Sequence, residues 1–196
     1  MPTTIRVIES QHTEALEHVR QFFRNYAAWL GVDLCFQNFD EEMASLPGDY
    51  SAPNGRLFFA ELDGKPAGCV GVRKISDGVC EMKRLYVEPS MRAHGIGRDL
   101  ALAAIGAAMD LGYKRVLLDT LPSMRIAVKL YRDLGFQEAP AYYLTPLEGT
   151  IFLSLDLDNW SGEKLKSRNL LHLFDFNRAW SRQMREVDPD FFKKLA

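Results

Sequence analysis

Apolar residues recur along this chain at two different spacings. Residues 12–30 carry apolar side chains three and four positions apart, which predicts an amphipathic helix that ends at Gly31. Residues 4–8 alternate between apolar and polar positions and predict a short strand. We expect a second, short helix over residues 40–45 and a loop over residues 46–55, where prolines and glycines gather.

Three strands are predicted to follow, over residues 56–62, 67–74 and 79–87. The short turns at Asp63-Gly64 and Ser76-Asp77-Gly78 between them indicate an antiparallel meander. The remaining predicted elements are a helix over 95–111, a strand over 115–120, a helix over 124–134 and strands near 136–143 and 150–157. This order of elements predicts an α/β fold, in which helices cover both faces of a mixed sheet.

The composition changes at residues 158–162, which read Asp-Asn-Trp-Ser-Gly, and we place a domain boundary near residue 160. One domain is expected over residues 1–158. Residues 159–196 are expected to form a helical C-terminal extension, with helices near 170–186 and 189–195.

Composition and charge exclude several classes of protein. The formal net charge is −2, from 24 basic and 26 acidic residues, which gives no support for a nucleic-acid surface. Cys35, Cys69 and Cys80 have no metal-ligand spacing, so we expect reduced core cysteines and no metal site. The first ten residues lack the apolar run of a signal peptide, and no segment is long enough to span a membrane. A cytoplasmic protein that binds neither nucleic acid nor membrane is therefore expected.

Two glycines open the long helix expected over residues 95–111. The first amides of a helix have no acceptor within it and carry the positive end of the dipole, so Gly95 and Gly97 fit an anion site. Arg92 and Arg98 flank the turn and can add charge-assisted hydrogen bonds. An ordinary loop-to-helix turn is the alternative, and so is a dinucleotide fold, since an aspartate ends the next strand. The dinucleotide pattern lacks its third glycine, because that position holds Leu100.

The turn and a second motif together resemble the GNAT superfamily of N-acetyltransferases. Residues 92–97, Arg-Ala-His-Gly-Ile-Gly, match the acetyl-CoA signature of that superfamily between a strand and a helix. The second motif matches at Ala127, Leu130, Tyr131, Gly135 and Phe136. The resemblance covers residues 4–157 and implies a GNAT-like acyl-CoA N-acyltransferase fold, with acetyl-CoA as a co-substrate.

The resemblance also implies which residues hold the cofactor. The pyrophosphate is expected on Arg92, Ala93, His94, Gly95, Ile96, Gly97 and Arg98, with the His94 ring itself in solvent. The pantetheine arm is expected to lie like an added strand beside the backbone of Leu85, Tyr86 and Val87, where one N–H polarises the thioester carbonyl. The family often has an asparagine where this chain has Met124, so Ser123 is expected to supply the missing polar contact.

Glu81 is the predicted general base, because histone-acetylating relatives carry a glutamate at similar spacing before the signature. Strand alternation predicts Glu81, Lys83, Leu85 and Val87 on one face, and Cys80, Met82, Arg84 and Tyr86 on the other. The alternative is that Glu81 only pairs with a cation such as Lys83 or Arg84.

Tyr131 is the predicted general acid, because the matching tyrosine in the family lies beside the cofactor sulfur. A phenol still carries its proton at neutral pH. The alternative is a tyrosine packed on its helix with the hydroxyl outward.

These residues predict an enzyme that moves acetyl from acetyl-CoA to a small-molecule or peptide primary amine by direct attack. The acceptor pocket is expected from the early helices, the loop around Tyr50 and the loop over residues 142–150, with Asp119, Tyr142 and Tyr143 as candidate lining residues. The alternative interpretation of Asp119 is a capping or strand-end residue, and that of Tyr142 and Tyr143 is two tyrosines on an edge strand. Two other hypotheses stay open: a non-catalytic acyl-CoA-binding module of a larger fusion protein, and a nucleotide-dependent oxidoreductase.

The C-terminal extension carries a second, shorter resemblance. Residues 177–180 and 188–196 resemble the N-terminal arm of β-class carbonic anhydrases, but none of that family's zinc ligands is present. One hypothesis is that the extension begins a truncated carbonic-anhydrase-like domain, without that activity. The alternative is an amphipathic appendage with Phe176, Trp180, Met184 and Val187 on one stripe. Such a stripe packs either on its own domain or on a second subunit in a homodimer.

Overall fold

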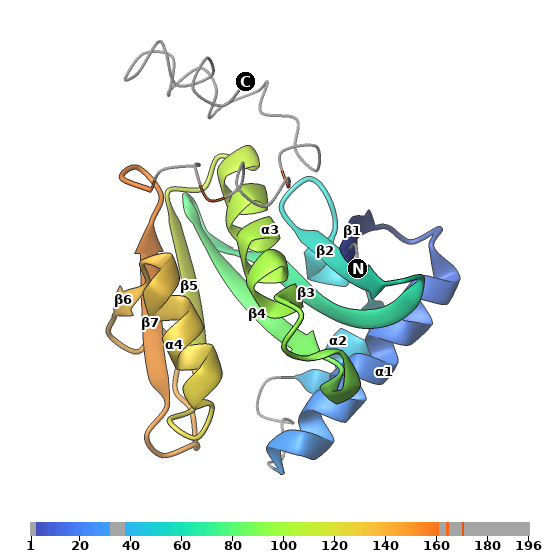
Figure 1. Ribbon diagram of the computed structural model, residues 1–196. Helices are drawn as coiled ribbons and strands as arrows, with labels where there is room; N and C mark the ends of the chain where they lie inside the picture. Colours follow the sequence, from blue (N-terminus) through green and yellow to red (C-terminus); the bar gives the residue numbers. More distant parts are fainter. Residues whose placement is uncertain (1–2, 32–37, 161–163, 165–169, 171–196) are drawn as a thin grey trace.

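The computed structural model of the 196-residue chain describes residues 3–31, 38–160, 164 and 170. Within this part, strands form one sheet in the order β1-β2-β3-β4-β5-β7-β6, with helices on both faces (Figure 1). Pairing is parallel between β4 and β5 and antiparallel between the other neighbours. The elements are β1 (Thr3–Ile8), α1 (Thr13–Leu30), α2 (Phe39–Ser45), the 3-10 turn η2 (Gly48–Tyr50), β2 (Arg56–Leu62), β3 (Lys65–Ser76), β4 (Val79–Val87), the 3-10 turn η3 (Pro89–Met91), α3 (Ile96–Asp110), β5 (Arg115–Thr120), α4 (Arg125–Leu134), β6 (Gln137–Glu138) and β7 (Ile151–Asp156).

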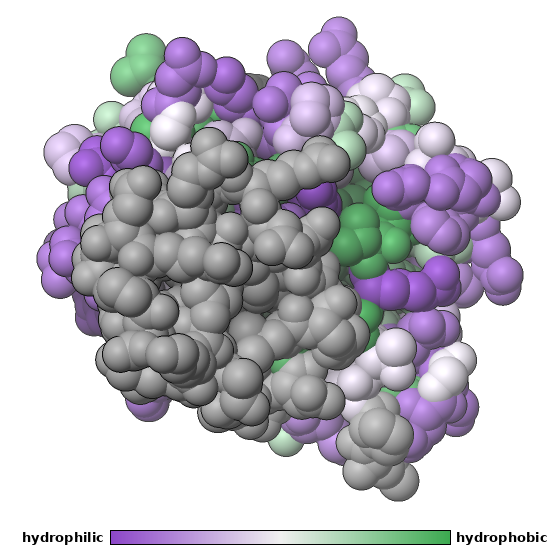
Figure 2. All heavy atoms as spheres, turned by 90° about the horizontal axis from the view of Figure 1, so that it is seen from above, coloured by the Kyte–Doolittle hydropathy of each residue, from purple (hydrophilic) through white to green (hydrophobic). Residues whose placement is uncertain are grey.

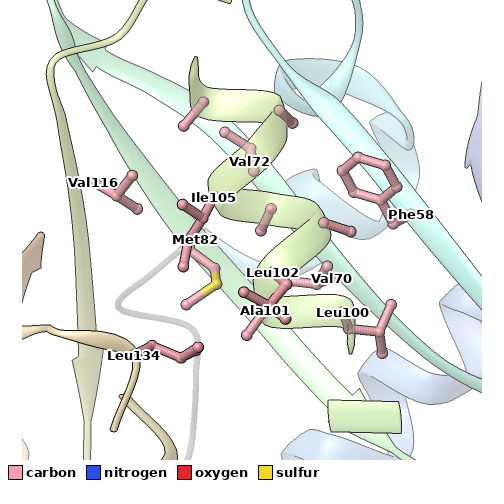
Figure 3. Packing of buried hydrophobic residues seen from close by; sticks show 14 of the residues in the cluster. Phe58, Val70, Val72, Met82, Leu100, Ala101, Leu102, Ile105, Val116 and Leu134 are labelled. Carbon is pink, nitrogen blue, oxygen red and sulfur yellow. The ribbon is translucent and has the colours of Figure 1, made fainter. Parts of the chain in front are cut away.

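Two hydrophobic clusters lie on opposite faces of the sheet. On one face α1 buries Leu16, Val19 and Phe23, which recur at helical spacing, against aromatic residues of the central strands. On the other face α3 is buried over almost its whole length, and Figure 3 shows Leu102 and Ile105 among the surrounding strand residues. Each such buried aliphatic side chain contributes roughly 1.5–3 kcal/mol to folding. The predicted mixed sheet with helices on both faces is confirmed.

The last strand before β7 is much shorter than the sequence predicts. A strand was expected over residues 136–143, but β6 contains only Gln137–Glu138. The amide of Ala139 still donates to the carbonyl of Phe152 at 2.9 Å. Pro140 then offers no N–H for the ladder, and the chain leaves the sheet as a loop. The helices predicted at 170–186 and 189–195, and the carbonic-anhydrase-like segment, lie outside the described residues.

A β-bulge in β4 shifts the alternation of its side chains. In the register of β3 and β4, Gly71 is opposite Lys83 and Cys69 is opposite Tyr86. Arg84 and Leu85 of β4 therefore lie opposite a single residue of β3, Val70. The first of the two, Arg84, has a φ of 59°.

The alternation predicted for β4 is therefore wrong beyond Lys83. Arg84 and Tyr86 lie on the α1 face, with Glu81 and Lys83, because Arg84 lies over the ring of Phe23 and Tyr86 joins the α1 cluster. Cys80, Met82, Leu85 and Val87 pack in the cluster on the α3 face. The extra residue of the bulge is the physical reason, since it reverses the order of inward and outward positions.

Strands β4 and β5 separate after a short parallel ladder. Their paired residues are Val79 with Arg115, Cys80 with Val116 and Glu81 with Leu117. Among the described residues, no strand pairs with β4 on this side beyond Glu81. β5 continues along β7 to the pair of Thr120 with Ile151. The sheet is thus open between β4 and β5, with backbone groups available along the opening.

The core includes residues at and beyond the boundary expected near residue 160. Trp160 is 8% exposed, and its indole N–H donates to the carbonyl of Leu134 at 3.0 Å. Leu170 is buried in the same cluster. These two residues therefore belong to the folding unit that the sheet organises.

The described surface is mostly polar. Among the coloured residues of Figure 2, hydrophilic side chains form most of the outer surface, and hydrophobic ones are visible mainly between them. In the described part of the chain, every helix is too short or too polar to cross a membrane.

Candidate active site

The turn between β4 and α3 exposes backbone amides at a helix N-terminus. Ala93 has a φ of 67° and Gly95 a φ of 82°, so the chain turns sharply just before Ile96. The amides of Arg98 and Asp99 donate to the Gly95 carbonyl at 3.0 and 3.1 Å. The preceding amides of the first turn point ahead of the helix, where the dipole favours an anion.

Two side chains shape this turn. Nε of Arg92 donates to the carbonyl of Val87 at 3.1 Å, and its guanidinium lies 5.5 Å from the ring centre of Trp29. His94 is exposed, with Nδ1 at 2.9 Å from the carbonyl oxygen of Arg92. These contacts anchor the side chains of Arg92 and His94 beside the turn.

A narrow cavity of 40 Å³ lies in the opening between β4 and β5, and we call it the β4–β5 cleft. Tyr131 and Met124 line it from α4 and its start, and Thr120 lines it from β5. Tyr131 is 7% exposed, and burial raises the pKa of its hydroxyl well above the usual range. The phenol therefore stays protonated at neutral pH and lies inside the molecule rather than on its outer surface.

A second cavity, of 590 Å³, opens beside α2, and we call it the α2 cavity. Its walls come from α2, from Tyr50 in η2, from the end of β3, from the first half of β4, and from Tyr142 and Tyr143. These are the segments from which the sequence predicts the acceptor pocket. The volume is large enough for a drug-sized molecule.

Glu81 lies in the wall of the α2 cavity, in a network of short polar contacts. Its side chain is 1% exposed. Nε of Arg73 donates to one carboxylate oxygen at 2.7 Å, and the hydroxyl of Tyr142 donates to the other at 2.7 Å. Nζ of Lys83 is 4.0 Å from that second oxygen. The buried carboxylate is thus compensated by a cation and a hydroxyl, as a charge in this position requires.

The bulge residue Arg84 forms a second buried ion pair. Its guanidinium donates to both carboxylate oxygens of Glu42, at 3.0 and 2.7 Å, and the Tyr50 hydroxyl donates to the same carboxylate at 2.5 Å. Burial alone would raise the pKa of Glu42, but the hydrogen bonds and charge of Arg84 outweigh it and lower that pKa. The pair joins α2, and hence one wall of the α2 cavity, to β4.

Lys83 lines both cavities. Burial lowers the pKa of its ammonium, although the nearby carboxylate of Glu81 opposes that shift. Across the cleft, burial raises the pKa of Asp119, while the charge of Lys83 opposes it. The two cavities therefore share a wall lysine, whose charge acts on the carboxylates of Glu81 and Asp119.

Comparison with known proteins assigns this architecture. A sequence model described as Acetyltransferase (GNAT) family matches residues 14–136. The chain belongs to the GNAT acetyltransferase family. Its relatives include an uncharacterised N-acetyltransferase of Schizosaccharomyces pombe, 34% identical over 80% of this chain and 97% of that protein. Another, from Dictyostelium discoideum, is 30% identical over 78% of this chain and 99% of that protein.

Solved structures support the same GNAT fold. A Bacillus subtilis acetyltransferase in complex with CoA superposes with a TM-score of 0.55 at 20% identity, covering 79% of this chain and 99% of that one. GNAT enzymes use acetyl-CoA, so this GNAT member is an acetyl-CoA-dependent N-acetyltransferase.

The predicted catalytic residues are divided between the two cavities. Glu81 lines the α2 cavity and Tyr131 lines the β4–β5 cleft. The cleft wall also contains Leu85, at the level where the pantetheine arm is expected. Of Met124 and Ser123, it is Met124 that lines the cleft, and Ser123 is exposed.

The sequence revealed only part of the surroundings of Glu81. It suggested Lys83 or Arg84, and Lys83 does form an ion pair with Glu81 at 4.0 Å, but Arg73 makes the closer contact and the bulge turns Arg84 towards Glu42. The predicted meander could have indicated Arg73, because Arg73 and Glu81 are opposite each other in the register of β3 and β4. Glu42 and Tyr50 gave no such signal, because their approach to Arg84 depends on tertiary packing.

Replacing Glu42 by alanine in this GNAT protein is expected to lower the free energy of unfolding by about 3–5 kcal/mol, since it leaves the Arg84 guanidinium buried without its partner. Because the pKa of Glu42 is lowered in the folded state, its stabilisation is present above its unfolded pKa. It is lost progressively as the pH falls below the ordinary glutamate value of 4.5 and through the lower pKa of the folded state. Urea unfolding at neutral and acid pH measures both effects.

The matched control is Glu41→Ala, which removes an exposed carboxylate from the same short helix. Glu41→Ala is expected to change stability by about 0.5 kcal/mol or less. Equal effects of the two substitutions would contradict the structural role of the ion pair.

Proposed function

We propose that this enzyme transfers acetyl from acetyl-CoA to a primary amine of a small molecule or peptide, by direct attack of the amine on the thioester. The observation that carries the proposal is that the two cavities share Lys83 as a wall residue. Glu81 lines one cavity and Tyr131 lines the other, so we place the amine and the thioester on either side of this shared residue. Proximity of this kind replaces a bimolecular encounter by a positioned reaction.

Acetyl-CoA binding is assigned to the turn and to the opened edge of β4. The pyrophosphate accepts from the amides of residues 93–97, with Arg92 and Arg98 at its sides. The pantetheine amides pair with the backbone of Leu85, Tyr86 and Val87, where β4 has no described strand neighbour on the β5 side. One N–H of this edge stabilises the oxyanion that forms as the amine attacks. Thr120, whose hydroxyl lies 3.6 Å from the sulfur of Met124, adds a polar group to the cleft.

Glu81 is proposed as the general base. An alkylammonium with a pKa near 10.4 must lose a proton before it attacks, and at neutral pH this costs about 4.6 kcal/mol. Arg73 balances the buried charge of Glu81 at 2.7 Å, which keeps a carboxylate in the wall of the α2 cavity. A positioned base contributes typically ~10²–10⁴-fold to the rate.

Tyr131 is proposed as the general acid. The leaving thiolate needs a proton when the carbon–sulfur bond breaks, and burial keeps the Tyr131 phenol protonated. Its ring is fixed by an edge-on contact with Phe136, with 5.8 Å between ring centres. The C–N bond forms as the C–S bond breaks, CoA leaves as the thiol, and no covalent enzyme intermediate is needed.

Replacing Tyr131 by phenylalanine is expected to lower kcat by ~10²-fold, because the leaving thiolate loses its proton donor. The dissociation constant for acetyl-CoA is expected to change by less than ~3-fold, since packing of the ring is kept. A free-thiol assay gives kcat, and calorimetric titration gives the dissociation constant. The matched control is Tyr113→Phe, which removes a hydroxyl that bonds to the Asn54 carbonyl at 2.7 Å outside both cavities. An unchanged kcat for Tyr131→Phe would remove Tyr131 from the mechanism.

A further inference from the structure

The carboxylate of Glu81 has little direct access to an acceptor. Its side chain is 1% exposed, Arg73 occupies one oxygen, and the hydroxyl of Tyr142 occupies the other. Each carboxylate oxygen can accept more than one hydrogen bond, but the Glu81 side chain exposes almost no surface, so an ammonium group in the α2 cavity has little room to reach it directly. The hydroxyl of Tyr142 is hydrogen-bonded to Glu81, and Tyr142 is the more exposed of the two residues in the wall of this cavity.

Tyr142 has the position and the rigidity that such a contact requires. It is half-buried and lines the α2 cavity, whereas Glu81 in the same wall is buried. Its ring is 5.2 Å from the ring of Phe152 in β7 and 5.2 Å from that of Tyr143, both edge-on. These contacts fix a loop residue against the sheet, so its hydroxyl is held at 2.7 Å from Glu81.

We propose that Tyr142 relays the proton from the acceptor ammonium to Glu81, as a further catalytic residue of the reaction. The inference rests on the proposed role of Glu81 as the base. The hydroxyl of Tyr142 already donates its only proton to Glu81, so its oxygen is left as an acceptor for the ammonium. As the N–H proton passes to that oxygen, the phenol proton passes to the carboxylate. The amine becomes neutral, Glu81 becomes protonated, and Tyr142 is a phenol before and after.

The electrostatics of the site fit a relay rather than a phenolate base. Burial, together with the charges of Glu81 and Asp119, raises the pKa of Tyr142 well above that of a free phenol. The phenolate is therefore not populated, and the oxygen gains a proton only as it gives one up.

The test compares two acceptors that differ in basicity. Butylamine is protonated at about pH 8, and its 2,2-difluoro analogue is largely neutral there, so only butylamine needs deprotonation before attack. Tyr142→Phe is expected to lower kcat/KM by ~10²-fold for butylamine and by less than ~3-fold for the analogue. Glu81→Gln is expected to show the same selective loss. The double variant is expected to be no slower than Glu81→Gln alone, because the two groups act on one proton.

The matched control is Tyr143→Phe. It makes the same change in the same loop, in a residue that also packs edge-on against Phe152. It is expected to keep the wild-type ratio of the two kcat/KM values. Equal losses for both amines in Tyr142→Phe would assign Tyr142 a packing role and overturn the relay. No loss in Tyr142→Phe, with a selective loss in Glu81→Gln, would also overturn it while Glu81 remains the base. No selective loss in Glu81→Gln would overturn the base and the relay together.

Discussion

Glu81→Gln is expected to lower kcat with an alkylamine acceptor by ~10²–10³-fold. The amide is almost isosteric with the carboxylate and still offers an oxygen to Arg73 or Tyr142, but it cannot take up a proton at neutral pH. Binding of acetyl-CoA is expected to stay within ~3-fold of wild type, because Glu81 lines the α2 cavity and not the β4–β5 cleft. Initial rates from released thiol, measured beside a calorimetric titration of acetyl-CoA, separate chemistry from binding.

The control for this substitution is Glu61→Gln. Glu61 is also a strand glutamate paired with an arginine, Arg6 at 3.4 Å, but it lies outside both cavities. Its replacement is expected to leave kcat unchanged. A Glu81→Gln enzyme that keeps the wild-type rate with a protonated amine would remove Glu81 as the base.

Gly97→Asp is expected to weaken acetyl-CoA binding by ~10²-fold or more, about 2.7 kcal/mol. A carboxylate at this position lies at the positive end of α3, where the pyrophosphate is proposed to bind, and repels it. The fold itself is expected to tolerate the change. A Cβ at Gly97 meets only Cγ2 of Val87, at 3.5 Å, and an acidic residue in the first turn of a helix is favourable.

Two measurements check this expectation. Calorimetric titration gives the affinity for acetyl-CoA, and thermal unfolding without ligand is expected to match wild type within a few degrees. The matched control is Gly97→Ala, which adds the Cβ without the charge and is expected to weaken binding far less. An unchanged affinity in Gly97→Asp would show that the pyrophosphate does not bind at this turn.

The sequence predicted most of the secondary structure because the spacing of apolar residues and the positions of turn residues indicate the same element boundaries in this chain. The bounds of β2, β4 and β5 are those predicted, since turn residues flank each strand. The strand expected over residues 136–143 fails after Glu138 because Pro140 interrupts the ladder. The apolar tyrosines beyond it favoured a strand, but they pack from a loop against Phe152.

The site was predictable as far as local motifs reach. The turn over residues 92–97 and the helix that carries Tyr131 lie where their motifs indicated. The bulge at Arg84 was not predictable, because strand alternation assumes one residue per position, and its positive φ has no local signal such as glycine. The pairs of Arg84 with Glu42 and of Glu81 with Tyr142 join residues 42 and 61 positions apart. Only the folded chain brings them together.

The most direct test of the mechanism measures two products in one reaction. The purified protein is incubated with acetyl-CoA and a panel of primary amines, free thiol is followed with time, and the amines are analysed by mass spectrometry. Amine-dependent release of CoA, with one acetylated amine formed for each thiol, is the predicted result, and it is expected to fall by ~10²-fold in both Glu81→Gln and Tyr131→Phe. Tight binding of acetyl-CoA with no acetylated amine would contradict it and would favour a module that only binds the cofactor.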